Sequence, residues 1–293
     1  MPERAYTAGH YALELAGKSV GAIATTAGGY ATADVVSEQT GDGSVRKHIG
    51  NVRYTDLEIS CGAGTAPSLL GWLTDTLGGK VVGKDGAVVV LGLDYTVVDR
   101  LEFSHALLAE FGFPALDASS KAAAQLTAKL TPESTRHASG SGKYSTATDK
   151  QKAWTAANFR LGIDGLVCNR VARVEPLVFR VRRGDAGAGE RRVDEKEPTV
   201  VEIPNLVVTL PASDVQTFAA WHESFVIQGN SSAANEKSGT LELLSPTMTP
   251  LFTLTFQGLG IFELAPVPTA AGAETVAKVT ASMYCQQISV AVA

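Results

Sequence analysis

The sequence predicts a mainly β protein of the α+β class, made of two similar tandem modules. Each module is expected to be a β-barrel or β-sandwich with one packed α-helix. One observation behind this is an internal repeat of three segment pairs in the same order: Tyr11–Gly17 with Phe159–Gly165, Trp72 with Trp221, and Ala128–Thr131 with Ala277–Thr280. The offsets are 159 − 11 = 148, 221 − 72 = 149 and 277 − 128 = 149 residues. A second observation is the alternation of apolar and polar residues in both halves, and a repeat in register decides the architecture before any local pattern does.

The length of the chain agrees with two modules. A chain of 293 residues suits two domains of ordinary size. We expect the first module at residues 1–133, a linker at 134–157 and the second module at 158–293. The stretch 132–157 is rich in Ser, Thr, Gly and Lys and poor in apolar residues, as is typical of a flexible linker.

Each half is expected to open with a half-buried strand that ends in a tight turn. Apolar residues alternate with polar ones at both places: Tyr11, Leu13 and Leu15, then Phe159, Leu161 and Ile163. The pairs that follow, Ala16-Gly17 and Asp164-Gly165, suit the left-handed backbone of a hairpin turn. Further strands are predicted in chain order: Thr55–Cys61, Val88–Val90, Leu101–His105, Leu206–Val208, Leu241–Leu243 and Phe252–Phe256.

One amphipathic helix is predicted in the first half. Thr65 can cap it, Pro67 suits its opening turn, and an apolar stripe runs from Leu69 to Leu77 before a Gly-Gly pair ends it. Trp72 lies within the stripe. We expect this side chain to be a core anchor.

A second helix is predicted at the matching place in the second half. Ser213 or Asp214 can cap it, and its apolar face continues to Phe225. Trp221 lies within this helix and is the second expected core anchor.

Each half also carries a long polar segment after its second strand. These segments are 36–48 and 182–198, and both contain Gly and charges of both signs. Polar loops of this length in a compact domain are usually functional or disordered. Their recurrence at corresponding places favours a functional role.

Bulk properties exclude several classes of function. The formal net charge of −5, with no cluster of Lys and Arg among aromatic residues, gives no nucleic-acid-binding signature. Three scattered cysteines, Cys61, Cys168 and Cys285, have neither metal-ligand spacing nor the pattern of a disulfide scaffold. The N-terminus shows no signal-peptide pattern and no apolar run is long enough for a membrane span, so we expect synthesis in the cytoplasm and no membrane insertion.

No catalytic or cofactor motif is present. The segment Gly140–Lys143 resembles part of a phosphate loop but departs from the full pattern at His137 and Tyr144. No Gly-x-Ser-x-Gly motif occurs, and the five histidines are isolated. We therefore expect no enzymatic activity, no catalytic residues, no cofactor and no metal.

The order of segments resembles the tail tube proteins of contractile phages, extracellular contractile injection systems and type VI secretion tubes. The segments that carry the resemblance are Tyr11–Gly17, Ala27–Gly29, Tyr54–Ser60, the Trp-containing helix at Leu69–Leu73, Leu93–Phe103 and Gly112–Ser120. The second module matches at Phe159–Gly165, at the Trp221 helix and from Phe256 to Thr280. Two departures are that the chain has two modules where typical subunits have one, and that the second lacks the usual polar turn near Glu175-Pro176.

The resemblance implies a structural role. Such proteins form six-fold rings in which sheets of neighbouring subunits join, and the rings stack into a hollow tube inside a sheath. Pairing between subunits would also protect sheet edges that otherwise aggregate. With two modules per chain, we expect a trimer that forms a pseudo-hexameric ring. The implied partners are further copies of the chain, sheath, baseplate and tail-terminator proteins, and cargo or DNA in the lumen of a phage tail or phage-tail-like particle.

The polar loops are expected to reach the adjacent ring. The charged residues expected to take part in ring stacking are Glu38, Asp42, Arg46, Lys47, Arg182, Arg183, Arg191, Arg192, Glu195 and Lys196. A baseplate hub or tube initiator of the same machinery is the alternative within this class, since such proteins also carry two tube-like modules per chain. A β-rich carbohydrate-binding or hydrolytic module is the alternative from another class, and it predicts a monomer with a concave pocket.

Overall fold

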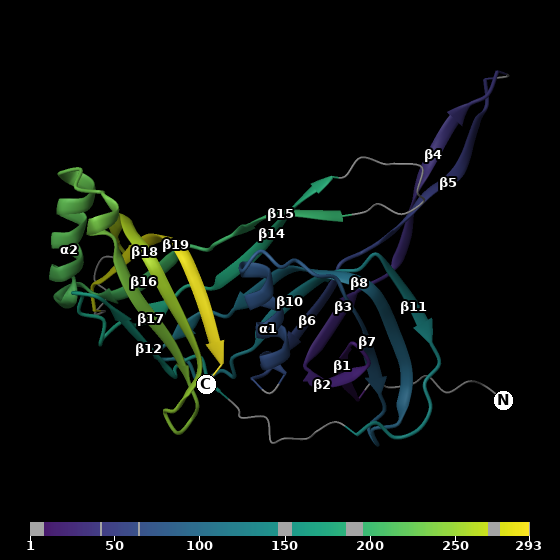
Figure 1. Ribbon diagram of the computed structural model, residues 1–293, viewed down its shortest axis with the longest axis horizontal. Helices are drawn as coiled ribbons and strands as arrows, with labels where there is room; N and C mark the ends of the chain where they lie inside the picture. Colours follow the sequence, from purple (N-terminus) through teal and green to yellow (C-terminus); the bar gives the residue numbers. More distant parts are fainter. Residues whose placement is uncertain are drawn as a thin grey trace.

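The computed structural model describes residues 9–41, 43–63, 65–145, 154–185, 196–268 and 276–292. The chain is mainly β with few helices, which confirms the predicted fold class. Curved antiparallel sheets form the body, and two helices lie against them (Figure 1). We refer to β1–β11 as the first half and to β12–β19 as the second half.

The described residues of the first half form eleven strands and one helix. In chain order they are β1 (His10–Leu15), β2 (Lys18–Ile23), β3 (Thr25–Gly28), β4 (Ala31–Gln39), β5 (Val45–Tyr54), β6 (Leu57–Cys61), α1 (Ala66–Leu77), β7 (Lys84–Leu91), β8 (Val97–Phe113), β9 (Leu116–Asp117), β10 (Leu126–Thr131) and β11 (Ser134–Ala138).

In the second half, eight strands and several helical segments are formed by the residues that the structure describes. In chain order they are β12 (Phe159–Ile163), β13 (Arg173–Val174), β14 (Leu177–Asp185), β15 (Lys196–Glu202), β16 (Leu206–Pro211), the 3-10 turn η1 (Ala212–Asp214), α2 (Gln216–His222), the π-helical turn η2 (Glu223–Ile227), the 3-10 turn η3 (Ala233–Asn235), β17 (Lys237–Leu244), β18 (Pro250–Pro266) and β19 (Lys278–Val292).

The two halves have the same strand order. In the first half the order across the sheet is β1-β7-β8-β10-β6-β3, and in the second it is β12-β17-β18-β19-β16-β13. All of these pairs are antiparallel. The hairpin β4–β5 corresponds to β14–β15, and each follows the short strand at the end of this order.

The register shows which residues correspond. The long strands β8 and β18 align at their register shifts, at Ala109 and Phe262, which gives 262 − 109 = 153. Their neighbours β7 and β17 then correspond at 241 − 88 = 153. Leu13 faces Val88 and Leu161 faces Leu241, so the opening strands correspond at 161 − 13 = 148. The opening repeat of the sequence is therefore in the correct register. The closing repeat is not, because Ala128 faces Phe111 while Ala281 faces Leu264, which gives 281 − 128 = 153. The match of Ala128–Thr131 with Ala277–Thr280 was shifted by four residues, since short apolar-polar alternations match at several offsets.

The turns and helices largely follow the sequence patterns. Ala16 and Gly17 have positive φ angles of 49° and 73°, as the hairpin turn between β1 and β2 requires. Thr65 is the N-cap residue of α1, but its hydroxyl makes no cap hydrogen bond and instead donates to the carbonyl oxygen of Ala22. The second helix starts later than predicted: Val215 is the N-cap residue of α2, and Ser213 and Asp214 belong to the preceding 3-10 turn.

Two predicted irregular regions contain regular strands. The segment 36–48 is mostly a β-hairpin, because β4 continues to Gln39 and β5 begins at Val45. The predicted linker 134–157 starts with β11, whose residues pair with β8, and it includes Trp154, which is 1% exposed. Backbone pairing outweighs the polar composition at these places, between β4 and β5 in the hairpin and with the long strand β8 at β11.

Candidate functional site

A strand pair joins the two halves of the chain. The first four residues of β14 lie antiparallel to the C-terminal end of β8, with Leu177 opposite Phe113 and Arg180 opposite Glu110. Beside this pair, β13 faces β9 through Arg173 and Asp117. We call residues 110–117 and 173–180 the junction. The β14–β8 pairing merges β14 into the sheets of the first half.

Aromatic side chains fill the buried face of the junction. Phe111, Phe113 and Phe179 are each at most 2% exposed. The Phe113 ring meets Phe111 edge-on at 5.4 Å between centroids and Phe179 at 6.3 Å. Edge-to-face aromatic pairs contribute about 0.5–1.5 kcal/mol beyond the burial of their area. The junction is therefore packed like a protein interior.

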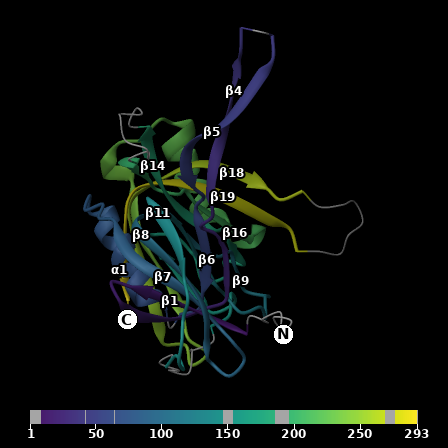
Figure 2. The same cartoon turned by 90° about the vertical axis from the view of Figure 1, so that its right-hand side faces the viewer.

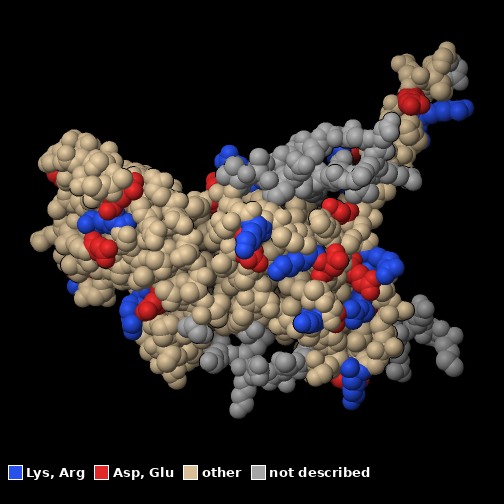
Figure 3. Space-filling model, viewed as in Figure 1, with Lys and Arg blue, Asp and Glu red and all other residues tan. Residues whose placement is uncertain are grey.

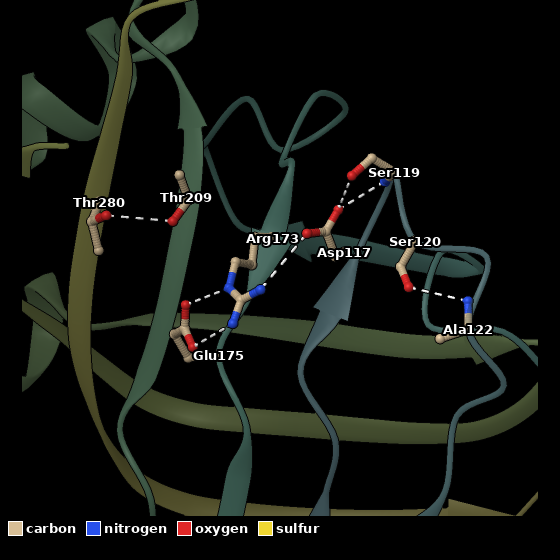
Figure 4. A network of polar contacts seen from close by, with 8 residues as sticks. All are labelled: Asp117, Ser119, Ser120, Ala122, Arg173, Glu175, Thr209 and Thr280. Atoms are coloured by element: carbon tan, nitrogen blue, oxygen red, sulfur yellow. Dashed lines mark hydrogen bonds and ion pairs between the residues drawn. The ribbon is translucent and has the colours of Figure 1, made fainter. Parts of the chain in front are cut away.

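Polar contacts hold the rim of the junction (Figure 4). Arg173 donates two hydrogen bonds to Glu175, of 2.6 and 3.2 Å, and lies 3.7 Å from the carboxylate of Asp117. Hydrogen bonds from the hydroxyl and backbone amide of Ser119 lower the pKa of Asp117, and the positive charge of Arg173 lowers it further. Arg180 lies 3.5 Å from Glu110. The charged groups around the buried face are thus paired across the two halves.

The first half has a corresponding hairpin, β4–β5, which among the described residues pairs with no strand of the other half. Strand β4 pairs only with β5 among the described residues, and the hairpin projects far from the body (Figure 1, Figure 2). Tyr30 is 63% exposed, and Ala31 and Thr32 are exposed. An exposed strand edge of this kind can pair with another strand through its backbone groups.

The two helices hold their tryptophans in matching environments. The indole N–H of Trp72 donates to the carbonyl oxygen of Val82 at 3.2 Å, and Lys84 Nζ lies 5.1 Å from the ring centroid. Trp221 donates to Asn235 at 3.3 Å, and Lys237 Nζ lies 5.4 Å from its ring centroid. Trp72 is 1% exposed and Trp221 is 8% exposed. Their indole groups are therefore used in packing and internal hydrogen bonds.

The residues expected in ring stacking lie on or near the two hairpins. Glu38 faces Arg46 near the end of β4–β5, and Lys47 is adjacent. Arg182 of β14 lies 3.4 Å from Glu202 of β15. Arg183 and Lys196 belong to β14 and β15. Four of the expected residues lie outside the described residues: Asp42, Arg191, Arg192 and Glu195.

The visible face of the molecule has no large area of one charge. Figure 3 shows basic and acidic side chains next to one another over the first half, and both signs on the projecting hairpin. Arg53 and Asp34, at 3.0 Å, are one such pair across β4 and β5. Interspersed charges of this kind suit polar contacts between surfaces better than attraction of a single strongly charged ligand.

The described residues form no recognisable reaction centre. Among them, no group of three or more His, Cys, Asp or Glu side chains is placed to hold a metal ion. His105 and His137 are exposed and lie beside Glu133 and Asp99 at 3.8 and 2.9 Å. Burial raises the pKa of the Cys61 thiol to about 12, which keeps it protonated. None of the helices in the described ranges has the length and apolar character needed to cross a membrane.

The sequence patterns did not locate the junction. Its residues continue β8 and β14 without a change in composition, and only the packing of one half on the other shows their role. One usable signal was available. Phe111-Gly112-Phe113 and Leu177-Val178-Phe179 are two short apolar runs that lack a polar alternation, which is typical of strands buried on both faces.

The sequence matches no protein-family profile and none of the curated proteins. Among solved structures, about half of the chain is similar to single chains of contractile injection machinery. One comes from the sheath–tube complex of an extracellular contractile injection system, PVC, in the extended state, with 16% identity and a TM-score of 0.42 over 47% of this chain and 94% of that one. Another comes from the tube-terminating cap of the anti-feeding prophage, with 17% identity and a TM-score of 0.42 over 48% and 95%.

Hcp1 from Flavobacterium johnsoniae is also similar, with 18% identity and a TM-score of 0.32 over 46% of this chain and all of the other. A chain of the anti-feeding prophage baseplate is similar with 12% identity and a TM-score of 0.37. Each of these proteins covers about one half of the present chain.

Proposed function

We propose that this chain is a structural subunit that assembles, as three copies, into a pseudo-hexameric ring of the inner tube of a contractile tail or injection system. Stacked rings would enclose a lumen for cargo or DNA. The observation that supports this most is the junction, where the edge of one half is extended by a strand of the other half of the same strand order. A chain that repeats this contact with further copies closes a ring.

Several features of the described residues agree with this role. The two halves share one strand order, as two equivalent positions in a ring require. The projecting hairpin β4–β5 carries paired charges of both signs, which suits a polar contact with an adjacent ring. Sheath, baseplate and terminator proteins are the proposed external partners, and the proposed location is a phage tail or phage-tail-like particle. We propose no catalytic role.

The proposed assembly is tested by mass photometry and negative-stain electron microscopy of the purified protein. We expect ring-shaped particles with three times the mass of the chain, and stacks of such rings at higher concentration. A sample that stays monomeric at all concentrations, or that forms rings of six full chains, would refute the trimeric ring.

The stacking role of the hairpin is tested separately. Replacing Arg46 and Lys47 with glutamate should leave single rings intact and abolish stacks, because these residues lie near the end of the projecting hairpin. Lys80, an exposed residue after α1, provides the matched control, and Lys80→Glu should stack normally. Stacks that survive the Arg46 and Lys47 substitutions would rule out this contact.

A further inference from the structure

The edge of β8 that β14 covers has a counterpart in β18. Both strands have 17 residues. Gly112 faces Thr127 in the first half and Ala265 faces Thr280 in the second, and each strand pair has its register shift at the corresponding place. Glu110–Phe113 therefore correspond to Glu263–Pro266. In β18 these residues pair with β19 on one side, and no described strand lies on the other side.

This end of β18 is more exposed at every corresponding position. Phe111, Gly112 and Phe113 are buried at the junction, whereas Leu264 and Ala265 are half-buried and Pro266 is exposed. Phe262, at the position of the register shift, is 45% exposed, whereas the corresponding Ala109 is 3% exposed. The edge of β18 is thus left in the state that the edge of β8 would have without β14.

The strand that would cover it is present at the other end of the chain. Val174 and Thr26 face equivalent residues of β16 and β6, so the two halves correspond here at 174 − 26 = 148. The same offset holds in the hairpins, where Arg180 faces Glu202 and Thr32 faces Arg53. Val178, Phe179 and Arg180, which cover β8, therefore correspond to Tyr30, Ala31 and Thr32.

On both edges, backbone N–H and C=O groups point to the unpaired side, where another strand could bind. The amide of Val267 donates to the carbonyl oxygen of Lys278 in β19, and successive residues of a strand point in alternate directions. The N–H and C=O of Leu264 consequently point to the open side. The amide of Thr55 donates to the carbonyl oxygen of Tyr30, so the backbone groups of Ala31 point away from β5. Ala31 and Leu264 each present a donor and an acceptor.

We propose that Tyr30–Thr32 of one chain pair with Glu263–Ala265 of a second copy, in the register of the intramolecular junction. Thr32 then lies opposite Glu263, Ala31 opposite Leu264 and Tyr30 opposite Ala265. We call this contact the seam. It rests on the proposed function, because it supplies the contact between chains that a ring needs, and it specifies the residues and the register.

The side chains fit this register. At the junction, Val178 lies opposite Gly112, and at the seam the large Tyr30 lies opposite the small Ala265. The hydroxyl of Thr32 takes the place of Arg180 and can donate to the carboxylate of Glu263. Ala31 and Leu264 take the places of Phe179 and Phe111, which face each other at the junction, and they bury less apolar area. The seam is therefore weaker than the junction, as suits a contact that forms after each chain has folded.

The helices give an independent indication of the same contact. α1 packs against β19, a strand of the other half, and has six buried residues. In the second half, α2 and the turn η2 that continues it also span twelve residues, of which three are buried: Phe218, Trp221 and Phe225. Ile227, at the end of the following π-helical turn, is 64% exposed. The surface around α2 is thus open where a second copy would contribute its first half.

Disulfide cross-linking tests the register. Tyr30 and Ala265 form a non-hydrogen-bonded pair in the proposed seam, with Cα atoms about 4.5 Å apart, which a disulfide can span. Two single variants, Tyr30→Cys and Ala265→Cys, are prepared in a Cys285→Ser background, because Cys285 is the least buried native cysteine. We expect a covalent dimer after oxidation of the mixture and none from either variant alone. Moving the second cysteine to Leu264, which faces the other side of the sheet, should abolish the dimer.

The outcomes separate the seam from the proposed function. The double variant Tyr30→Cys/Ala265→Cys should give a ladder of covalent products that ends at three chains if the ring is a trimer. Rings by electron microscopy without the cross-link would overturn the seam and leave the tube function standing. Cross-linked dimers without rings would support the seam and overturn the function. Failure of both would overturn both.

Discussion

Replacing Phe179 with alanine should weaken the packing between the two halves of the chain and lower the free energy of unfolding. The side chain is 1% exposed and packs edge-on against Phe113, so it belongs to β14 but is buried against β8. A buried phenylalanine removes about 150–250 Å² from water, which at ~25 cal/mol per Å² corresponds to about 4–6 kcal/mol. Alanine retains part of this area, so we expect a loss of about 3–5 kcal/mol in the free energy of unfolding.

Urea unfolding followed by circular dichroism measures this loss. Phe262→Ala is the comparison variant, because Phe262 lies in β18 at 45% exposure. Its truncation removes roughly half as much buried apolar area, so we expect roughly half the loss. Phe179→Leu should lose less than about 1.5 kcal/mol, since it preserves most of the volume. If Phe179→Ala lost no more stability than Phe262→Ala, the junction would not be a packed interface between the two halves.

Three further predictions concern stability, pH and thiol chemistry. Trp72→Phe should lose about 1–3 kcal/mol, because the smaller ring leaves unfilled space at a site that is 1% exposed and the hydrogen bond from the indole to Val82 is lost, and thermal unfolding should show a lower Tm than for the wild type. The lowered pKa of Asp117 means that its ionised form is favoured by folding. Its contribution is therefore complete above the unfolded pKa of about 4 and is lost as the pH falls through the folded pKa. Asp117→Asn should flatten the dependence of the urea midpoint on pH below about pH 5, and an unchanged slope would contradict this. Cys61, with a pKa of about 12 and 1% exposure, should not react with a thiol reagent at pH 8 until urea unfolds the chain, and rapid labelling of native Cys61 by mass spectrometry would contradict its burial.

Local patterns located most of the regular structure. The alternation at Tyr11–Leu15 and Phe159–Ile163 predicted the opening strands, and Ala16-Gly17 closes the predicted hairpin. Asp164-Gly165 forms a turn but no hairpin, because among the described strands β12 pairs with the distant β17 and not with a strand that follows it directly. The apolar stripe ending at Leu77 predicted α1 correctly. These features depend on residues close in sequence, for which the period of the apolar pattern is a direct readout of the buried face.

The polar segments were read incorrectly because composition does not reveal pairing. Strands β4 and β5 extend well into the segment predicted as a loop, since a two-stranded hairpin can pair its backbone groups while both faces remain exposed. Ser134–Ala138 became a strand because β8 is long enough to hold partners along its whole length. Neither outcome has a signature in side-chain periodicity.

The sequence by itself determined that one pattern of strands and helix occurs twice, because each copy carries its own alternation, turn residues and tryptophan. Only the tertiary structure decided how the copies meet. Leu177–Arg180 and Tyr30–Thr32 occupy the same place in their halves, yet one set covers β8 and the other is exposed. The reason is that strand pairing is made by backbone groups common to all residues. Which edge is covered therefore depends on which strand the chain brings alongside, and this is a property of the folded molecule.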